Sequence, residues 1–371
     1  MAMIPRRATR LVRAGTVGIG GNSLVSVQAM AKTDTSDIEA TVRQVRALAA
    51  GGARLVRLAV PDEQAALALA EIKKRTTVPL VADIHFDWHL ALRSLESGAD
   101  KLRINPGNLG GREPLAQVAK AARDRCVPIR VGVNAGSLER DLLAKYGGPA
   151  PEAIADSALR NVSLLLDLGF EDIVISAKSS DTYDTVAAYR IISSQCDYPL
   201  HIGITETGPG LLGITKSAVG IGALLAEGIG DTIRVSLTGP PEDEVRAGKM
   251  ILRSLGLMPG LDIISCPTCG RCRQSIIPFA EKVASALEGV EADVTVAVMG
   301  CEVNGPGEAK QADIGLALTR GGAVLFERGK VVLTGDAEGL VDEMIARVKA
   351  LGPKETGVRT GGVGTPEAPE T

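Results

Sequence analysis

Three cysteines lie within the seven-residue stretch CPTCGRC, from Cys266 to Cys272. A fourth, Cys301, opens a second unusual stretch, CEVNGPGE, which ends at Glu308. The spacing C-x2-C-x2-C followed by one remote cysteine is typical of a metal site. Four thiolates suit a structural zinc ion, whereas compact spacing with one distant ligand also suits an iron–sulfur cluster. The spacing favours the cluster, because CPTC is not followed by a clear second CxxC knuckle.

A second set of residues suited to chemistry lies at the ends of predicted strands. Arg57, Arg103, Arg130 and Lys178 belong to four different strand-like segments. A guanidinium group offers a planar pair of donors that matches phosphate oxygens, so these cations together predict a substrate that carries phosphate. Alternation along a strand sends neighbouring side chains to opposite faces, so not every strand-end residue can point inward. The other polar candidates at the strand ends are Asp83, His85, Asn105, Asn134, Glu206, Arg234 and Ser236.

Three of these candidates can be interpreted in more than one way. Asp83 and His85 are spaced as a possible metal pair, but structural hydrogen bonding explains His85 equally well. Glu206 lies in the stretch TETGPG after a predicted strand and is a candidate general acid. A carboxylate there would also interact favourably with the N-terminus of the following helix.

Eight short apolar runs rich in β-branched residues recur between residues 23 and 238 and alternate with helical patterns. This alternation predicts an α/β fold with a closed (β/α)8 TIM-type barrel, whose active site lies at the carboxyl ends of the strands. The predicted strands are 23–30, 54–60, 79–86, 101–108, 128–136, 172–180, 199–206 and 231–238.

The pattern changes after residue 260, so we expect a barrel domain over residues 1–260 and a smaller α+β domain over 261–352. In the second domain, residues 314–319 are predicted to form a strand, and 323–335 a hairpin that turns at Glu327–Lys330. A closing helix is expected over 341–351. Residues 353–371 are mostly Gly, Thr, Pro and Glu and predict a disordered tail.

Composition excludes several other classes of protein. The chain has 371 residues, a net charge of −3 and basic residues spread along its length. The sequence therefore shows no basic cluster of the kind that binds nucleic acid. No apolar run approaches the roughly 20 residues that cross a bilayer. The basic start, MAMIPRRATR, is not followed by the apolar region of a signal peptide. We therefore expect a cytoplasmic protein that binds neither membrane nor nucleic acid.

Several longer motifs carry a resemblance to a known family. The chain resembles the 4-hydroxy-3-methylbut-2-enyl diphosphate synthases, of the compact bacterial type with two domains. The resemblance runs in order from about residue 10 to residue 350. Its motifs are DIHFD (83–87), RINPGN (103–108), GVNAGSLE (132–139), TETG (205–208), EGIGDTIRVSL (227–237), CPTCGR (266–271) and GCEVNGPGEA (300–309).

The resemblance implies a [4Fe–4S] cluster held by Cys266, Cys269, Cys301 and Glu308. Cys272 departs from the family pattern, which does not need a third cysteine in this stretch. Cys272 and Glu308 are thus alternative ligands for the fourth iron. Glu308 is favoured because a carboxylate is a harder, more easily displaced ligand that leaves one iron open to substrate, whereas a fourth thiolate would close the site.

The resemblance also implies the reaction, in which 2-C-methyl-D-erythritol 2,4-cyclodiphosphate takes up two electrons, loses water and becomes (E)-4-hydroxy-3-methylbut-2-enyl diphosphate. Reduced flavodoxin or ferredoxin would supply the electrons, and a homodimer would bring the cluster domain of one chain to the barrel of the other. Glu206 would donate a proton, with Asp83 and Asn105 positioning groups at the mouth. The implied diphosphate ligands are Arg57, Arg103, Arg130, Asn134, Lys178 and Ser236.

Two other hypotheses remain open from the residues alone. One is a non-redox barrel transferase of the dihydropteroate synthase kind, with a zinc-stabilised second domain. The other is a zinc ribbon that contacts RNA, which predicts basic and aromatic residues around the cysteines. Arg271 and Arg273 are present, but Phe279 is the one aromatic residue nearby, which disfavours this second hypothesis.

Overall fold

The structure is a computed structural model that describes residues 5–269, 272, 275–290, 292–300, 312–319 and 321–351. Cys301, Glu308 and the predicted tail 353–371 lie outside the described residues. The chain divides into two compact units, one spanning residues 4–257 and the other continuing from residue 258. None of the described helices combines the length and apolar character needed to cross a membrane.

The first unit is built on eight parallel strands in the order β8-β7-β6-β5-β4-β3-β10-β9. A parallel bridge between Ile175 of β8 and Leu200, just before β9, brings the two ends of this sheet together. All eight predicted strands are present, and the predicted TIM-type barrel is confirmed. The strands are β3 (Ser26–Met30), β4 (Leu55–Ala59), β5 (Leu80–Asp83), β6 (Lys101–Ile104), β7 (Ile129–Asn134), β8 (Ile173–Lys178), β9 (His201–Ile202) and β10 (Thr232–Ile233).

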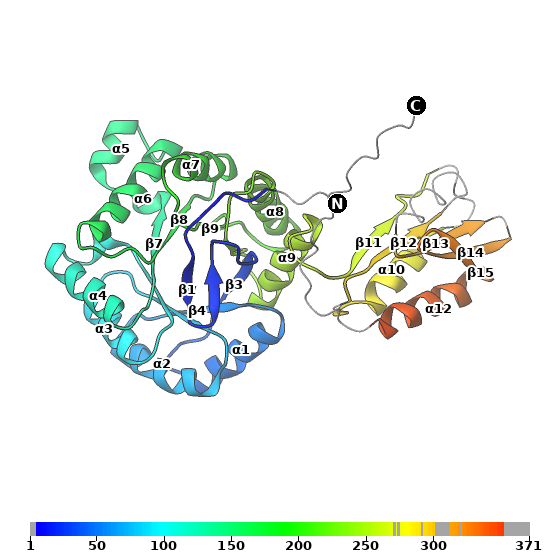
Figure 1. Ribbon diagram of the computed structural model, residues 1–371, viewed down its shortest axis with the longest axis horizontal. Helices are drawn as coiled ribbons and strands as arrows, with labels where there is room; N and C mark the ends of the chain where they lie inside the picture. Colours follow the sequence, from blue (N-terminus) through cyan, green and yellow to red (C-terminus); the bar gives the residue numbers. More distant parts are fainter. Residues whose placement is uncertain are drawn as a thin grey trace, which may run out of the picture. The chain divides into compact units, whose positions relative to one another are not determined.

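Helices follow the strands and surround them (Figure 1). Aspartate side chains at Asp37, Asp62, Asp87 and Asp181 accept a hydrogen bond from the first turn of α1, α2, α3 and α7, which fixes where these helices begin. The helices are α1 (Ile38–Ala50), α2 (Glu63–Arg75), α3 (Trp88–Glu96), α4 (Arg112–Asp124), α5 (Arg140–Tyr146), α6 (Pro151–Leu166), α7 (Thr182–Gln195), α8 (Gly210–Ala226) and α9 (Pro241–Ser254), with 3-10 turns η1 (Pro106–Asn108) and η2 (Ala135–Ser137).

A short antiparallel hairpin, β1 (Val12–Ala14) and β2 (Val17–Ile19), closes one end of the barrel. Figure 1 shows this hairpin in dark blue across the ring of strands. Its four buried apolar side chains pack against Leu55, Val81 and Val174, which lie near the amino ends of their strands. The closed end is therefore opposite the carboxyl ends, where the active site is expected. The sequence pattern did not predict this hairpin.

The second unit has a five-stranded sheet in the order β11-β12-β13-β14-β15, parallel from β11 to β13 and antiparallel from β13 to β15. Helices α10 (Ile277–Ala286) and α12 (Ala337–Ala350) pack with the sheet around one apolar core (Figure 1). The predicted strand, hairpin and closing helix are confirmed, but β11 was missed because it is half exposed and lacks a clear pattern. The strands are β11 (Asp262–Ser265), β12 (Thr295–Met299), β13 (Ile314–Thr319), β14 (Gly322–Glu327) and β15 (Lys330–Gly335).

The hairpin that closes the barrel predicts a stability effect. Ile19 is fully buried in it, so Ile19→Ala should lower the free energy of unfolding of the barrel by about 2–5 kcal/mol. Leu67 lies on α2 with about half of its surface exposed, and Leu67→Ala should change stability by about 0.5 kcal/mol or less. Urea unfolding of both variants measures the difference. Equal, small effects would mean that the hairpin is not part of the cooperative barrel.

Candidate active site

Neighbouring strands carry charged side chains at one level inside the barrel. In the strand register Asp83 of β5 lies opposite Arg103 of β6, and Arg103 lies opposite Arg130 of β7. Residues opposite each other in register point to the same face of a sheet. Three residues that the sequence placed at strand ends are thus brought together.

Asp83 is a buried carboxylate among cations. Its Oδ1 lies 3.3 Å from Arg103 Nη1 and its Oδ2 lies 3.6 Å from Arg57 Nε, while His85 Nε2 lies 3.4 Å from Oδ2. Burial alone would raise the pKa of Asp83, but Arg57, His85 and Arg103 outweigh burial and hold that pKa well below its usual range. Asp83 is therefore an ionised anchor for the guanidinium groups, and no metal partner is needed to explain His85.

The guanidinium groups keep unused donors. Arg130 is 1% exposed, and its Nε and Nη2 have no hydrogen-bond partner within the described part of the chain. Arg103 Nε is likewise unpartnered, and Arg57 donates to Met30 Sδ, a weak acceptor. Burial first, and then repulsion from Arg57 and Arg103, lowers the pKa of Arg130. Such buried donors are costly unless an acceptor arrives.

The barrel interior holds further polar groups. Lys101, fully buried on β6, donates to Gln28 Oε1 at 3.0 Å. Lys178 Nζ lies 3.4 Å from His201 Nε2, and His201 Nδ1 lies 2.6 Å from Thr232 Oγ1. Burial, followed by repulsion from Arg130, lowers the pKa of Lys101, Lys178 and His201. His201 is therefore a neutral neighbour of Lys178.

Arg234 closes the ring from the segment after β10. Its Nη2 lies 3.4 Å from Glu244 Oε2 on α9, and Glu244 also accepts from Leu237 N and pairs with Lys32. Burial first, then Arg57, lowers the pKa of Arg234. Glu244 is shared among several donors, so it neutralises little of the charge inside the barrel.

The described residues thus place six cationic side chains in and around the barrel interior against two carboxylates, Asp83 and Glu244. The six repel one another electrostatically. Each of them either lowers the pKa of another member of the set or has its own pKa lowered by one. An interior of this kind is built for an anion of more than one charge. The cations are Arg57, Lys101, Arg103, Arg130, Lys178 and Arg234.

Two glycines make room for these cations. A Cβ on Gly132 of β7 would lie 2.4 Å from Arg103 Nε. A Cβ on Gly203, after β9, would lie 2.9 Å from Lys178 Nζ and 2.3 Å from the carbonyl oxygen of Arg234. Side chains at these positions would push the cations out of place.

The other predicted residues lie at or just beyond the carboxyl ends of the strands. Glu206 is exposed after β9, and its φ of 53° is unusual for a residue other than glycine. Asn134 is half buried and lies opposite Lys178 in the register, and Ser236 is half buried. Asn105 is buried, and its Oδ1 faces Gly107 N at 3.2 Å. Its carbonyl oxygen is already used to cap η1, which leaves its amide NH2 for other contacts.

Three described cysteines of the second unit, Cys266, Cys269 and Cys272, lie in the segment that follows β11. Cys269 is exposed, and Cys266 and Cys272 are half buried with their Sγ atoms 4.0 Å apart. A Cβ on Gly300 would lie 2.6 Å from Cys272 Sγ, so the glycine leaves space for this thiol. Soft thiols gathered on one loop fit iron or zinc. Within the described residues no group of three metal-ligating side chains is assembled, and Cys301 and Glu308 lie outside them.

Sequence reasoning did not select Lys101, His201 and Glu244. Lys101 precedes Arg103 by two residues, so strand alternation was the signal that could have found it. His201 and Glu244 lie on a two-residue strand and on a helix, where no local pattern marks an inward side chain.

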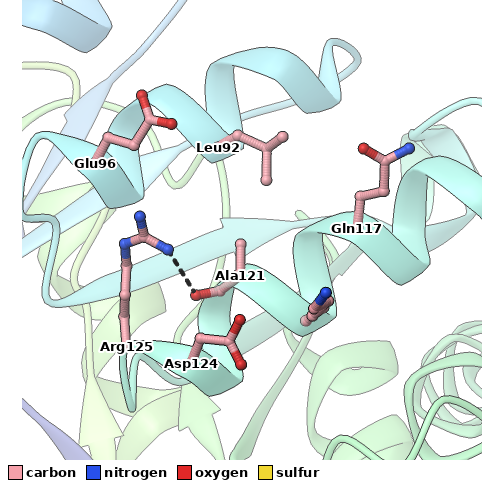
Figure 2. Close-up of a pocket in the computed structure, with 7 residues that line it drawn as sticks. Leu92, Glu96, Gln117, Ala121, Asp124 and Arg125 are labelled. Carbon is pink, nitrogen blue, oxygen red and sulfur yellow. Dashed lines mark hydrogen bonds between the residues drawn. The ribbon is translucent and has the colours of Figure 1, made fainter.

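A hollow on the outside of the barrel does not compete with this site. Figure 2 shows it between α3 and α4, with Arg125 Nη1 donating to Ala121 O at 3.4 Å. Both charge signs line it, and its charged side chains lie at the surface. Its lining residues are Leu92, Glu96, Gln117, Lys120, Ala121, Asp124 and Arg125.

The crowding of cations predicts opposite effects of one substitution. Lys178→Met removes a buried charge repelled by Arg130, so the free protein should become more stable by about 1 kcal/mol. Loss of a charge-assisted contact should weaken binding of inorganic pyrophosphate by about 10- to 100-fold. Thermal unfolding and titration calorimetry measure the two effects, with Lys120→Met on the exposed face of α4 as control. Unchanged pyrophosphate affinity would show that Lys178 does not face the anion.

Comparison with known proteins covers nearly the whole chain. The GcpE TIM-barrel domain matches residues 9–249, and the GcpE protein C-terminal domain matches residues 262–350. Two relatives are each named 4-hydroxy-3-methylbut-2-en-1-yl diphosphate synthase (flavodoxin). The one from Geobacter sulfurreducens is 54% identical, covering 92% of this chain and 98% of its own. The one from Caldanaerobacter subterraneus subsp. tengcongensis is 52% identical, covering 94% of this chain and 99% of its own.

Among solved structures, a dihydropteroate synthase from Yersinia pestis is 11% identical, with a TM-score of 0.47 over 66% of this chain and 98% of that chain. Similarity at this level supports no argument about function. The two domain matches and the relatives at about half identity over almost their full lengths decide the family, and this chain belongs to the GcpE family.

Proposed function

We propose that this chain catalyses the reductive ring opening and dehydration of 2-C-methyl-D-erythritol 2,4-cyclodiphosphate to (E)-4-hydroxy-3-methylbut-2-enyl diphosphate, a step of the non-mevalonate isoprenoid pathway. The observation that carries the proposal is the barrel interior, where cations outnumber carboxylates and buried guanidinium donors lack partners among the described residues. A cyclic diphosphate supplies the missing acceptors and the missing negative charge. The names of the curated relatives support this choice of diphosphate.

The diphosphate is held by the cations of four strands, with Asn134 at the end of β7 and Ser236 on the loop after β10. Arg103 and Arg130 present the unpartnered donors, and Lys178 adds a third positive charge. Neutralising the diphosphate makes it a better leaving group when the carbon–oxygen bond of the ring breaks. The proposed ligands are Arg57, Arg103, Arg130, Asn134, Lys178 and Ser236.

Three residues serve catalysis or positioning. Glu206 supplies the proton to the departing hydroxyl, so that it leaves as water. Its positive φ is consistent with this role, because strained backbone is concentrated at functional sites. Asp83 holds Arg57 and Arg103 in place, and Asn105 positions groups at the mouth.

The second unit provides the redox centre. Cys266, Cys269, Cys301 and Glu308 hold a [4Fe–4S] cluster, which when bound supplies electrons one at a time and an iron that acts as a Lewis acid. Glu308 rather than Cys272 is the fourth ligand, because a carboxylate is displaced more easily than a thiolate.

Two electrons must come from a partner protein, and we propose reduced flavodoxin, which the names of the relatives include. Ferredoxin is the alternative donor. We further propose a cytoplasmic homodimer in which the substrate-binding domain of one chain, residues 1–260, works with the cluster domain of the other, residues 261–352.

Metal analysis of protein isolated without air tests this function. We expect about four iron and four sulfide per chain, and turnover of the cyclic diphosphate with reduced flavodoxin. Cys272→Ser should keep the iron, the sulfide and the turnover, whereas the matched variant Cys266→Ser should lose the cluster. About one zinc without sulfide would overturn the redox function. Loss of the cluster in Cys272→Ser would overturn the ligand assignment alone.

Substitution of the proposed proton donor tests its role. Glu206→Gln keeps the size of the side chain but removes the acid, so kcat should fall by about 100-fold or more, with iron and sulfide content unchanged. Glu227→Gln is a matched control, since Glu227 pairs with Arg190 on the exposed surface. Steady-state kinetics with reduced flavodoxin gives the comparison. Wild-type kcat in Glu206→Gln would assign the proton to another group.

A further inference from the structure

Two loops leave neighbouring barrel strands next to proposed site residues. The loop after β6 starts at Asn105 and continues through η1, and the loop after β7 follows Asn134, the last residue of that strand, and reaches α5 through Glu139. Both lie beyond the ends of the barrel strands, so the ladder of the sheet does not hold them. Side chains of α6 contact both loops.

Asn161 of α6 spans the gap between the loops. It is 1% exposed, and its Oδ1 accepts a hydrogen bond from Gly107 N at 2.7 Å. Its Nδ2 donates to Glu139 Oε1 at 3.1 Å and to Ser157 O at 2.9 Å. The backbone N–H of Gly107 can only donate, so the orientation of the Asn161 amide follows from its partners.

Ser157 completes the hold on the second loop. It lies one turn before Asn161, is also 1% exposed, and donates from Oγ to Glu139 Oε2 at 2.6 Å. Each oxygen of the Glu139 carboxylate is thus bound by a neutral donor of α6. A hydrogen bond to a charged acceptor is stronger than one between neutral groups.

The bond to Gly107 also reaches Asn105. Gly107 N is shared between Asn161 Oδ1 and Asn105 Oδ1, at 2.7 and 3.2 Å. A Cβ on Gly107 would lie 3.3 Å from Asn161 Oδ1, so a glycine permits this close approach. The position of Asn161 therefore sets the position of the amide that orients the Asn105 side chain.

An asparagine inside a helix is a weak helix former that competes for backbone hydrogen bonds. Asn161 instead uses its side chain across the tertiary structure, on a helix that packs against β7, β8 and η1. We infer that Asn161 is a positioning residue for the proposed reaction: with Ser157 and Glu139 it fixes the loops after β6 and β7 relative to one another, and so fixes Asn105 at the mouth. This inference rests on the proposed function, which identifies the substrate as the cyclic diphosphate.

The first test compares Asn161→Ala with wild type. Loss of loop position should lower kcat for the cyclic diphosphate by about 10- to 100-fold, because displacement by about 1 Å has effects of that size. Iron and sulfide content and the affinity for inorganic pyrophosphate should not change, since the cations of the barrel strands remain in place. An unchanged kcat, or a loss of pyrophosphate affinity that matches the loss of kcat, would overturn the positioning role.

Rescue by a second substitution tests the contact itself. Asn161→Asp keeps the acceptor for Gly107 N but sets two carboxylates against each other, so kcat should fall. Adding Glu139→Gln supplies an amide donor to the new carboxylate and should restore most of kcat. No restoration would overturn the direct coupling of Asn161 to Glu139.

A matched pair on the same helix is the control for general effects on α6. Ser157→Ala removes the bond to Glu139, whereas Ser163→Ala removes a bond from an exposed serine to Leu159 O. Ser157→Ala should lower kcat and Ser163→Ala should not. Equal effects would assign the loss to the helix rather than to the loops.

Hydrogen–deuterium exchange at the Gly107 amide separates this inference from the proposed function. Exchange should accelerate in Asn161→Ala and stay at the wild-type rate in Ser163→Ala, whether or not the protein turns over the cyclic diphosphate. Faster exchange in Asn161→Ala, in a protein that does not turn over the cyclic diphosphate, would contradict the proposed substrate but support the loop network. Unaltered exchange in Asn161→Ala would contradict the loop network.

Discussion

The balance of charge around Asp83 is the constraint on which the rest of the barrel depends. One buried carboxylate, Asp83, lies between Arg57 and Arg103, and Arg130 and Lys178 are close enough to these arginines to be repelled by them. Two like charges 4 Å apart repel by about 4 kcal/mol at the effective dielectric of a protein surface. The free barrel is therefore under electrostatic strain, and an anion with two or more charges relieves it. Affinity for a diphosphate and reduced stability of the empty site have the same physical cause.

The remaining parts of the first unit support this arrangement. The hairpin of β1 and β2 seals the amino ends of the strands with apolar side chains, so the charged groups are reached from the opposite end. Gly132 and Gly203 give the cations room within a ring of strands that is otherwise filled by side chains. Asn105, Asn134 and Glu206 then lie at the carboxyl ends of the strands, and buried polar groups of α6 hold the loops after β6 and β7.

Division into two units separates two kinds of chemistry. The barrel presents hard cationic donors that suit phosphate oxygens, whereas the loop after β11 presents soft thiols that suit iron. The half-buried Cys272 lies with its Sγ 4.0 Å from that of Cys266, in space that Gly300 leaves free. A third thiol so close to a proposed ligand makes the comparison of Cys266→Ser with Cys272→Ser informative about both residues.

Local signals in the sequence determined the barrel, the strand-end cations and the cysteine motif. Strand–helix alternation is a property of short segments, and the carboxyl ends of parallel strands converge in every barrel. The sequence alone therefore predicts that Arg57, Arg103, Arg130 and Lys178 share one site. Tertiary structure alone decided which donors are left without partners among the described residues, because that depends on neighbours from other strands. It also revealed the sealing hairpin, whose three-residue strands are too short to leave a pattern, and the inward position of His201 on a two-residue strand. Asn161 is the clearest case: a polar residue within a helix is expected at the surface, and only packing against two distant loops shows why it is buried.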